Sequence, residues 1–278
     1  MLPNFIVIGV AKCGTTTLCD ALAKHPEIFI SQPKEPNYFN KSIHYKATRD
    51  EYEDLFENAG SIPFRGEGSV GYTNPNRIHF IPKRIHQAIP DCRIIFMVRH
   101  PIKRLESEWK MRLRFNNTSQ EFNEALQYDM MLYNHGLYWN TLSHYLEHFK
   151  KEQILTVFME DLHKSFDTEI FRVLKHIGAD TEYKLSSTHS NAAKSYKKDT
   201  VFSAFLKGIL GDRIKSRIPD SLKDMFRGTI TKEWDYDINW DPEVYNEVAQ
   251  YFAEDSQALL EHCGKSSDYW DFSFPGEK

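Results

Sequence analysis

The sequence predicts an α/β fold in which a mostly parallel sheet is flanked by helices. Residues 5–10 and 92–98 are nearly continuous apolar runs, the pattern typical of parallel strands that are covered on both faces. Between such runs, apolar residues recur at helical spacing, as in residues 77–89. Strands that alternate with helices favour a parallel sheet. No linker, repeat or low-complexity segment divides the 278 residues, so we expect a single domain over residues 1–278.

The first half of the chain contains a strand over residues 5–10 and a helix that opens at Thr15 and ends near His25. A short apolar run predicts a second strand over residues 28–30. Helical spacing predicts helices over residues 52–59 and 77–89. The apolar run 92–98 predicts a further buried strand.

The second half is expected to be mainly helical. Pro101 suits the first turn of a helix that follows residues 92–98. Apolar periodicity predicts helices over residues 121–128 and 138–149, and residues 154–159 read as a buried strand. Ser165 is a plausible N-cap for a helix over residues 165–177, which Gly178 would close. Asp241 would cap a long final helix that ends at residue 263.

Composition excludes several classes of protein. The formal net charge of −4 argues against a general nucleic-acid-binding protein. No apolar stretch is long enough to span a membrane, and the first strand begins without a leader, so we expect a cytoplasmic protein. The four cysteines lack metal-ligand spacing and are interpreted as reduced thiols.

Residues 9–17 combine the features of an anion site. Gly9 and Gly14 bracket a turn that carries Lys12, and three threonines, Thr15, Thr16 and Thr17, then open the helix. A strand, a glycine-rich turn and a helix N-terminus together present backbone N–H groups and positive charge to one point. Lys12 precedes the second glycine, unlike the lysine of a Walker A loop. The ligand should be a phosphate or a sulfate.

A second anion site is expected where residues 92–98 end. Arg99 would lie at the carboxyl end of that strand, where open α/β sheets bind ligands. In the helix that follows, Lys103, Arg104 and Ser107 have spacings of three and four, which predicts one shared edge. A guanidinium and a hydroxyl placed in this way can hold a second phosphate.

These segments resemble motifs of the sulfotransferases that use 3′-phosphoadenosine 5′-phosphosulfate (PAPS), in particular the heparan-sulfate branch. Gly-Val-Ala-Lys-Cys-Gly-Thr-Thr-Thr at residues 9–17 resembles the 5′-phosphosulfate loop of that family. Arg-His-Pro-Ile-Lys-Arg-Leu-Glu-Ser at residues 99–107 resembles its 3′-phosphate motif. Residues 191–196 resemble its nucleotide-closing loop, and the likeness extends to a final helix followed by Trp270. The resemblance implies a P-loop-like α/β fold.

The resemblance also assigns the donor-binding residues. By that match, PAPS is the donor and Arg99 and Ser107 hold its 3′-phosphate. Around the nucleotide, Tyr196 would stack on adenine, although Ser195 replaces the usual glycine of that loop. The other matched residues are Lys12, Cys13, Gly14, Thr15, Thr16 and Thr17 at the 5′-phosphate, and Lys194 in the closing loop.

Glu35 is the residue that the resemblance identifies as the general base. It lies between Pro33 and Pro36, which hold it on a stiff, extended loop. The resemblance also implies that Lys34, Ser69 and Tyr72 contact the acceptor. Gly68 departs from the pattern, because several animal members have a catalytic lysine there. Lys34 or a histidine could replace that lysine.

The expected reaction is therefore transfer of a sulfuryl group to a hydroxyl or amine, with Glu35 as base and Lys12 at the leaving phosphate. The acceptor stays open between a carbohydrate and a small molecule, with the aromatic content slightly favouring the latter. No metal is expected, and Glu160 and Asp161 are interpreted as structural. A nucleotide-dependent kinase and an inactive nucleotide-binding protein are the alternatives. A missing membrane anchor favours a bacterial member or an excised catalytic domain.

Overall fold

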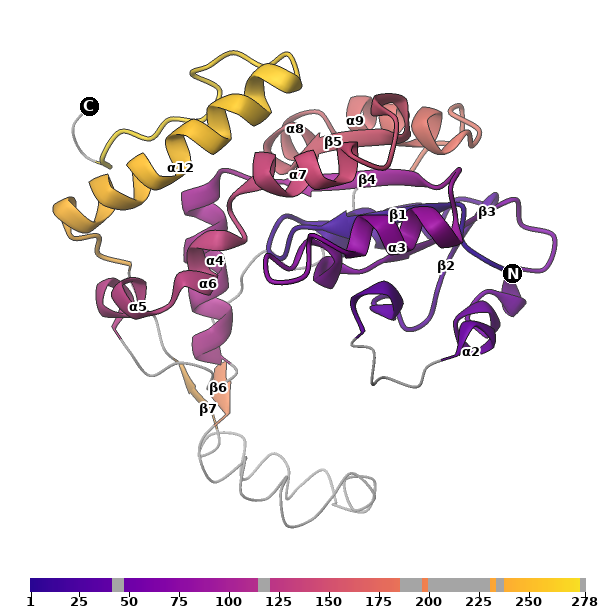
Figure 1. Cartoon of the computed structure of the whole chain (residues 1–278), viewed down its shortest axis with the longest axis horizontal. Coiled ribbons are helices and arrows are strands. Elements are labelled where there is room, and N and C mark those ends of the chain that lie inside the picture. Colours follow the sequence, from indigo (N-terminus) through magenta and orange to yellow (C-terminus); the bar gives the residue numbers. More distant parts are fainter. Residues whose placement is uncertain (42–47, 115–120, 186–196, 200–230, 234–237, 276–278) are drawn as a thin grey trace, which may run out of the picture.

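A computed structural model describes residues 1–41, 48–114, 121–185, 197–199, 231–233 and 238–275. Its centre is a five-stranded sheet with the order β2-β3-β1-β4-β5 (Figure 1). All four pairings between the described strands of this sheet are parallel. The strands are β1 (Phe5–Gly9), β2 (Ile28–Ile30), β3 (Phe64–Gly68), β4 (Arg93–Val98) and β5 (Ile154–Phe158).

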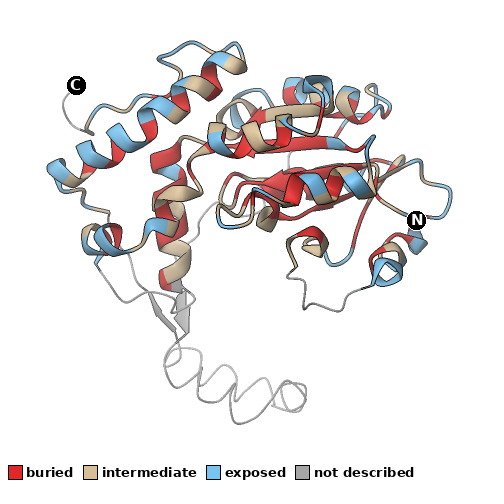
Figure 2. Ribbon diagram, in the orientation of Figure 1, coloured by how far each residue is buried: buried red, intermediate tan, exposed pale blue. Residues whose placement is uncertain are grey.

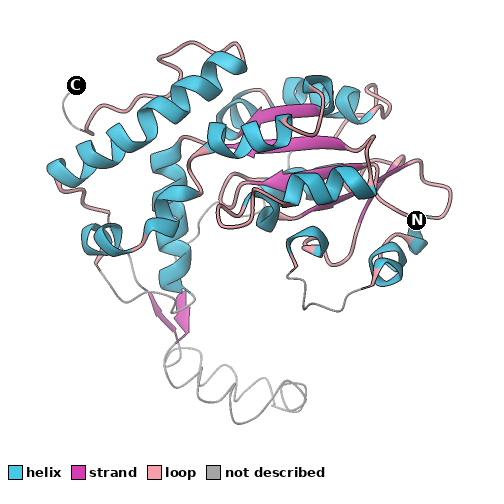
Figure 3. Ribbon diagram, in the orientation of Figure 1, coloured by secondary structure: helices cyan, strands magenta, loops and turns pink. Residues whose placement is uncertain are grey.

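Burial of the strands explains why the sequence forms this sheet. All five residues of β1 are buried, and so are the last five of β4, as Figure 2 shows. Burial of this kind requires cover on both faces, and Figure 3 shows helices on both sides of the sheet. β1 pairs with β3 in the register Phe5↔Gly66, and the Phe5 ring lies over Gly66. A Cβ at Gly66 would come within 2.2 Å of that ring.

The helices alternate with the strands along most of the chain. α9 (Phe166–Ile177) lies against β4 and β5, while α3 (Ile81–Ala88) packs beside α7 (Tyr138–Leu146). The others are α1 (Thr15–Leu22), α2 (Arg49–Asp54), α4 (Pro101–Arg114), α5 (Phe122–Tyr128), α6 (Met130–Asn134), α8 (Met159–Lys164) and α12 (Pro242–His262). Short 3-10 turns cover Tyr38–Asn40, Glu57–Ala59, Val70–Thr73 and Lys151–Gln153.

A second hydrophobic cluster extends the molecule beyond the sheet. It joins Trp109 of α4, Phe122 of α5 and Phe252 of α12, so the long last helix packs on α4 as well as on α7. A small antiparallel pair, β6 (Lys197–Asp199) and β7 (Thr231–Glu233), lies at the far end of α4 (Figure 1).

Most expected elements are confirmed, with local differences. β2 has the expected bounds, and β1, β4 and β5 are each shorter by one residue. The helix expected over 52–59 is instead α2 followed by a 3-10 turn, and α3 begins only at Ile81, with Pro82 in its first turn. Gly178 closes α9 with a φ of 95°. No described helix is long and apolar enough to cross a bilayer.

Candidate active site

Every segment of the site follows the carboxyl end of a strand. β1, β2, β3 and β4 end at Gly9, Ile30, Gly68 and Val98, and they run parallel, so these ends share one edge of the sheet. The next residues along the chain are the anion loop 10–14, the Glu35 loop 31–40, the turn 69–73 and the start of α4 at 99–101. The topology thus brings together the segments that the sequence motifs single out.

The anion loop passes from β1 into α1 with unusual backbone angles. Lys12 has a φ of 72°, and Gly14, the N-cap of α1, has a φ of 86°. Gly9 has a φ of 146°, and a Cβ there would lie 2.7 Å from the Thr73 side chain. Because Gly14 has no side chain, the first turn of α1 lacks a side-chain cap and its N–H groups point toward this edge. The loop has the form of an anion cradle.

Lys34 reaches across to the beginning of α1. Its Nζ lies 3.3 Å from Thr15 Oγ1 and 3.2 Å from Thr16 Oγ1, and it donates to both hydroxyls. The same Nζ is 3.3 Å from Glu35 Oε1. Gly68 lies beside this path, and a Cβ there would come within 2.7 Å of Cys19 Sγ but only to an ordinary contact distance, 3.4 Å, from Lys34 Cε. The sequence motif alone did not indicate these contacts of Lys34.

The Glu35 loop is tied to β3 and to the turn after it. Ser31 N donates to Gly66 O at 2.9 Å, and Gly68 N donates to Lys34 O at 3.0 Å. Asn37, with a φ of 52°, donates from its side chain to Glu35 O at 3.3 Å. The Glu35 side chain itself is about one-third exposed and faces solvent at the same edge. The loop therefore presents a carboxylate beside the anion cradle.

Ser69 and Tyr72 lie inside the protein, and their burial argues against the expected contact with an acceptor. Both side chains have no exposed surface. Ser69 Oγ donates to Glu67 Oε2 at 2.5 Å, and Tyr72 OH donates to Glu67 Oε1 at 2.8 Å. Glu67 is itself fully buried, and burial raises the pKa of its carboxyl to about 7, against the lowering effect of these hydrogen bonds. The sequence analysis did not identify Glu67.

Arg99 lies just before α4 and Ser107 in the middle of that helix, and both are half-buried. Tyr138 OH donates to Arg99 O at 2.7 Å and lies 3.8 Å from Cys13 Sγ, so the backbone of Arg99 lies close to the anion loop. Arg104 differs from the expectation, because it does not share an exposed edge with Lys103. Its side chain is fully buried, pairs with Glu108 and donates to Leu132 O. Through its hydrogen bond to Leu132 O, Arg104 joins the buried face of α4 to α6.

Cys13 lies in the anion loop with its side chain turned inward. The thiol is fully buried and 3.8 Å from Tyr138 OH. Burial raises its pKa to about 12, so the thiol stays protonated and is not a nucleophile at neutral pH. Cys13 can therefore contribute to an anion site only through its backbone.

The two acids after β5 have structural partners. Glu160 Oε1 accepts from His100 N at 2.8 Å, which joins the start of α8 to the start of α4. Asp161 accepts from Tyr269 OH at 2.8 Å and pairs with Lys265. Among the residues that the structure describes, no group of three His, Cys, Asp or Glu side chains could hold a metal ion.

The expected nucleotide-closing residues Lys194, Ser195 and Tyr196 lie outside the described residues. β6, which begins at Lys197, lies against α4, the helix that carries Ser107.

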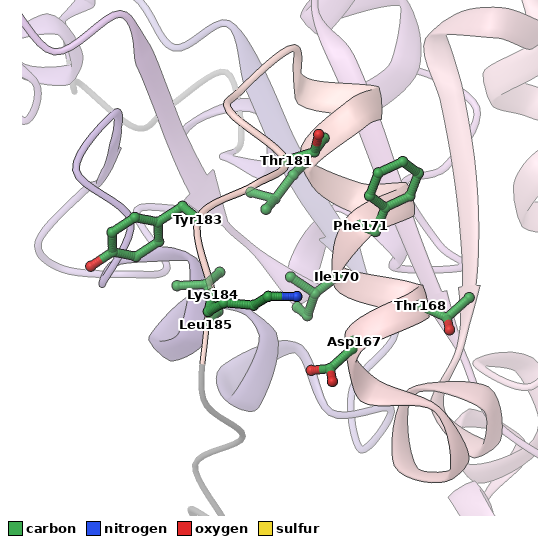
Figure 4. Close-up of a pocket in the computed structure, with 9 residues that line it drawn as sticks. Asp167, Thr168, Ile170, Phe171, Thr181, Tyr183, Lys184 and Leu185 are labelled. Atoms are coloured by element: carbon green, nitrogen blue, oxygen red, sulfur yellow. The ribbon is translucent and has the colours of Figure 1, made fainter.

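A hollow of about 310 Å³ lies elsewhere, between α9 and residues 181–185 (Figure 4). Its lining includes Phe171, Tyr183 and Leu185. The backbone of Asp180, next to it, accepts from His25 Nε2 at 2.9 Å and donates to Glu27 Oε2 at 2.8 Å. His25 and Glu27 come just before β2 begins, so this hollow is at the opposite edge of the sheet from the anion loop.

Comparison with known proteins agrees with this geometry. Carbohydrate sulfotransferase 15 of Mus musculus is 23% identical over 225 residues, which cover 63% of this chain and 40% of that protein. Heparan sulfate glucosamine 3-O-sulfotransferase 6 of Homo sapiens is 27% identical over 205 residues, covering 70% of this chain and 57% of that protein. The matches thus span less than two thirds of these longer relatives.

The fold has a counterpart among solved structures. A sulfotransferase from Alicyclobacillus acidocaldarius matches with a TM-score of 0.70 and 21% identity, over 96% of this chain and 97% of that one. At this identity the likeness establishes the fold. A sequence model of the sulfotransferase domain matches residues 2–264. Because this match covers nearly the whole chain, the protein belongs to the sulfotransferase domain family.

Proposed function

We propose that the protein transfers a sulfuryl group from PAPS to a hydroxyl or amine of a carbohydrate or small-molecule acceptor. One observation carries the proposal: Lys34 bridges the first turn of α1 and the carboxylate of Glu35. An anion cradle and a carboxylate of suitable chemistry for a general base are thereby held side by side.

The residues at this edge fit a donor with two separate phosphates. The N–H groups of the anion loop, Lys12 and the hydroxyls of Thr15 and Thr16 suit the 5′-phosphosulfate end. Arg99, at the end of the neighbouring strand β4, suits the 3′-phosphate, and Ser107 lies two turns further along α4. A nucleotide with a single phosphate chain would leave the second position unused.

The reaction needs one proton transfer and one stabilised leaving group. The acceptor oxygen or nitrogen forms a bond to sulfur, and the bond between sulfur and the bridging oxygen breaks. Glu35 takes the acceptor proton. The electron pair stays on the oxygen of the 5′-phosphate, where Lys12 stabilises the developing charge. The products are a sulfated acceptor and 3′,5′-adenosine bisphosphate.

Lys34 is the residue that we expect to contact the sulfuryl oxygens. Its Nζ already donates to the two hydroxyls at the start of α1, so a small movement brings it onto an anion bound there. Lys34 therefore fills the role that a lysine at position 68 has in the related animal enzymes.

Thermal unfolding with three nucleotides tests the donor. 3′,5′-Adenosine bisphosphate should raise the melting temperature without added metal, and ADP at the same concentration should raise it much less. The kinase alternative instead predicts stabilisation by ATP with Mg²⁺ and none by the bisphosphate. That result would overturn the proposal.

Sulfate transfer from labelled PAPS then tests the acceptor class. The relatives are named for carbohydrate and heparan sulfate acceptors, so desulfated heparan sulfate represents the first class. A simple phenol represents small molecules. Label in neither class, despite tight bisphosphate binding, would favour the alternative of an inactive nucleotide-binding protein.

A further inference from the structure

The buried carboxylate of Glu67 accepts hydrogen bonds from three hydroxyl groups beneath the Glu35 loop. Glu67 lies in β3, opposite Ile6 of β1, and has no exposed surface. Tyr52 OH donates to its Oε1 at 2.5 Å, in addition to the bonds from Ser69 and Tyr72. Three hydroxyl protons thus converge on two carboxylate oxygens in the interior of the sheet.

Two of these hydroxyls also hold the backbone of the Glu35 loop. Ser69 Oγ accepts from Asn37 N at 3.1 Å, and Tyr72 OH accepts from Phe39 N at 3.3 Å. Each hydroxyl has one proton, so it can accept from the loop and donate onward only to an acceptor. The two carboxyl oxygens of Glu67 are such acceptors, Oε2 for Ser69 and Oε1 for Tyr72. The two loop amides are therefore connected to Glu67 through one hydroxyl each.

We propose that Glu67 is a positioning residue that fixes the Glu35 loop, through Ser69 and Tyr72, in the conformation that the transfer reaction needs. The inference rests on the proposed role of Glu35 as base. Asn37 and Phe39 follow Glu35 by two and four residues, and Asn37 also donates from its side chain to Glu35 O. Anchoring both amides therefore limits the directions in which the Glu35 carboxylate can point.

The packing around this network supports a positioning role. A Cβ at Gly71 would come within 2.3 Å of Asn37 Oδ1 and 2.6 Å of Asn40 Nδ2, so the loop lies directly on the turn that joins Ser69 and Tyr72. Burying a carboxylate is unfavourable unless its hydrogen bonds are satisfied. Glu67 meets this condition with three donors, two of which reach the loop.

Amide hydrogen exchange tests the connection without reference to activity. Ser69→Ala should speed exchange at Asn37, and Tyr72→Phe should speed exchange at Phe39, each by about fivefold or more, as expected for loss of one hydrogen bond. Tyr245→Phe is the matched control, because Tyr245 is also buried and its hydroxyl donates to the backbone, at Ser273 O. Exchange at residues 33–40 that matches this control in both variants would overturn the proposal.

Non-additivity tests whether the effect passes through Glu67. Glu67→Gln keeps the size of the side chain but replaces one acceptor oxygen by an NH₂ donor. If Ser69 and Tyr72 act through Glu67, Tyr72→Phe should speed exchange at Phe39 less in the Glu67→Gln background than in the wild type. Full additivity of the two changes would overturn the role of Glu67.

Turnover separates positioning from mere structural support. Release of sulfate from PAPS with water as acceptor can be followed without knowing the natural acceptor. Ser69→Ala and Tyr72→Phe should each lower kcat by about tenfold, while the dissociation constant of 3′,5′-adenosine bisphosphate changes less than about twofold. Faster loop exchange with unchanged kcat would overturn the positioning role.

Glu35→Gln distinguishes this inference from the proposed function. If that variant keeps wild-type turnover, Glu35 is not the base and the proposed function needs another residue. The exchange measurements would still decide whether Glu67 holds the loop, because they do not depend on the reaction. Wild-type turnover of Glu35→Gln would therefore overturn the positioning role of Glu67 in catalysis. Amide hydrogen exchange alone would then decide whether Glu67 holds the loop through Ser69 and Tyr72.

Discussion

Glu35 and Lys34 are adjacent in sequence but have different surroundings. Lys34 is mostly buried and points to α1, whereas Glu35 is about one-third exposed beside it. A carboxylate this close to a phosphate site is repelled by the ligand, and the 3.3 Å contact with Lys34 offsets part of that repulsion. Under the proposed function, movement of Lys34 to the sulfuryl oxygens would release Glu35 to accept a proton.

Replacement of Glu35 tests its role as the base. Glu35→Gln keeps the size of the side chain but cannot accept the acceptor proton, so turnover should fall at least about a hundredfold, the low end for general base catalysis. Bisphosphate affinity and melting temperature should stay near the wild-type values, because the side chain is partly exposed. Turnover is measured with saturating donor and acceptor. More than about a tenth of wild-type turnover would assign the base elsewhere.

Replacement of Arg99 tests the 3′-phosphate position. Arg99→Ala removes a guanidinium at the end of β4, and loss of a charge-assisted bond should weaken bisphosphate binding by about 10- to 100-fold. Lys103→Ala is the control: Lys103 is exposed on the same helix and pairs with Glu106. Calorimetric titration of both variants gives the comparison. Equal affinities for the two variants would place the 3′-phosphate elsewhere.

Sequence patterns identified the residues whose neighbours in sequence restrict or free the backbone, namely proline and glycine. Two flanking prolines indicated that Glu35 lies on a stiff loop, and two flanking glycines indicated that Lys12 lies in an anion-binding turn. Glu67 had no such signal, because an acid in a glycine-rich stretch is usually exposed, and only the surrounding hydroxyls show why it is buried. Arg104 was expected on an exposed edge, and its burial was missed for the same reason, since its partner Leu132 O is 28 residues away in α6.

At the scale of elements, β3 is the clearest difference between pattern and structure. Its sequence, Phe-Arg-Gly-Glu-Gly, lacks the apolar alternation from which strands are predicted. Tertiary contacts replace that signal. A Cβ at Gly66 would clash with the Phe5 ring, and a Cβ at Gly68 would clash with Cys19 Sγ of α1. The strand is therefore specified by its neighbours β1 and β2 and by the loop that crosses it.

The two predicted N-caps behave differently, and this gives a test at the same scale. Asp241 accepts from the N–H groups of Glu243 and Val244 at the start of α12, but Ser165 makes no side-chain cap bond in α9. Asp241→Ala should lower the free energy of unfolding by about 0.5–2 kcal/mol. Ser165→Ala should change it by less than about 0.5 kcal/mol. Urea unfolding measures both, and equal losses would contradict the assignment of the caps.

At the scale of the whole molecule, the site depends on contacts between segments far apart in the sequence. The anion loop, the Glu35 loop and Arg99 meet because β1, β2 and β4 end at one edge. Sequence patterns predicted the parallel sheet and thereby this meeting. They could not predict that Lys34 contacts Thr15 and Thr16, since that distance depends on how the loop lies on β3.

The buried carboxyl of Glu67 should make the stability of the whole protein depend on pH. Its pKa is raised from 4.5 to about 7 in the folded state, so between these values the folded protein binds a proton that the unfolded chain has released. Stability from this group is therefore complete below about pH 4.5 and is lost as the pH rises through about 7. The full loss is on the order of 3 kcal/mol.

Urea unfolding of the wild type and of Glu67→Gln between pH 5 and pH 8 isolates this contribution. The free energy of unfolding of the wild type, relative to the variant, should decrease from pH 5 to about pH 7 and then level off, since glutamine does not titrate. Burial is the main cause that raises the pKa of Glu67, and the charge of Glu35 raises it further. The hydrogen bonds from the hydroxyls of Tyr52, Ser69 and Tyr72 lower it. A difference that stays constant over this range would mean that the hydrogen bonds outweigh burial and that Glu67 is ionised throughout it.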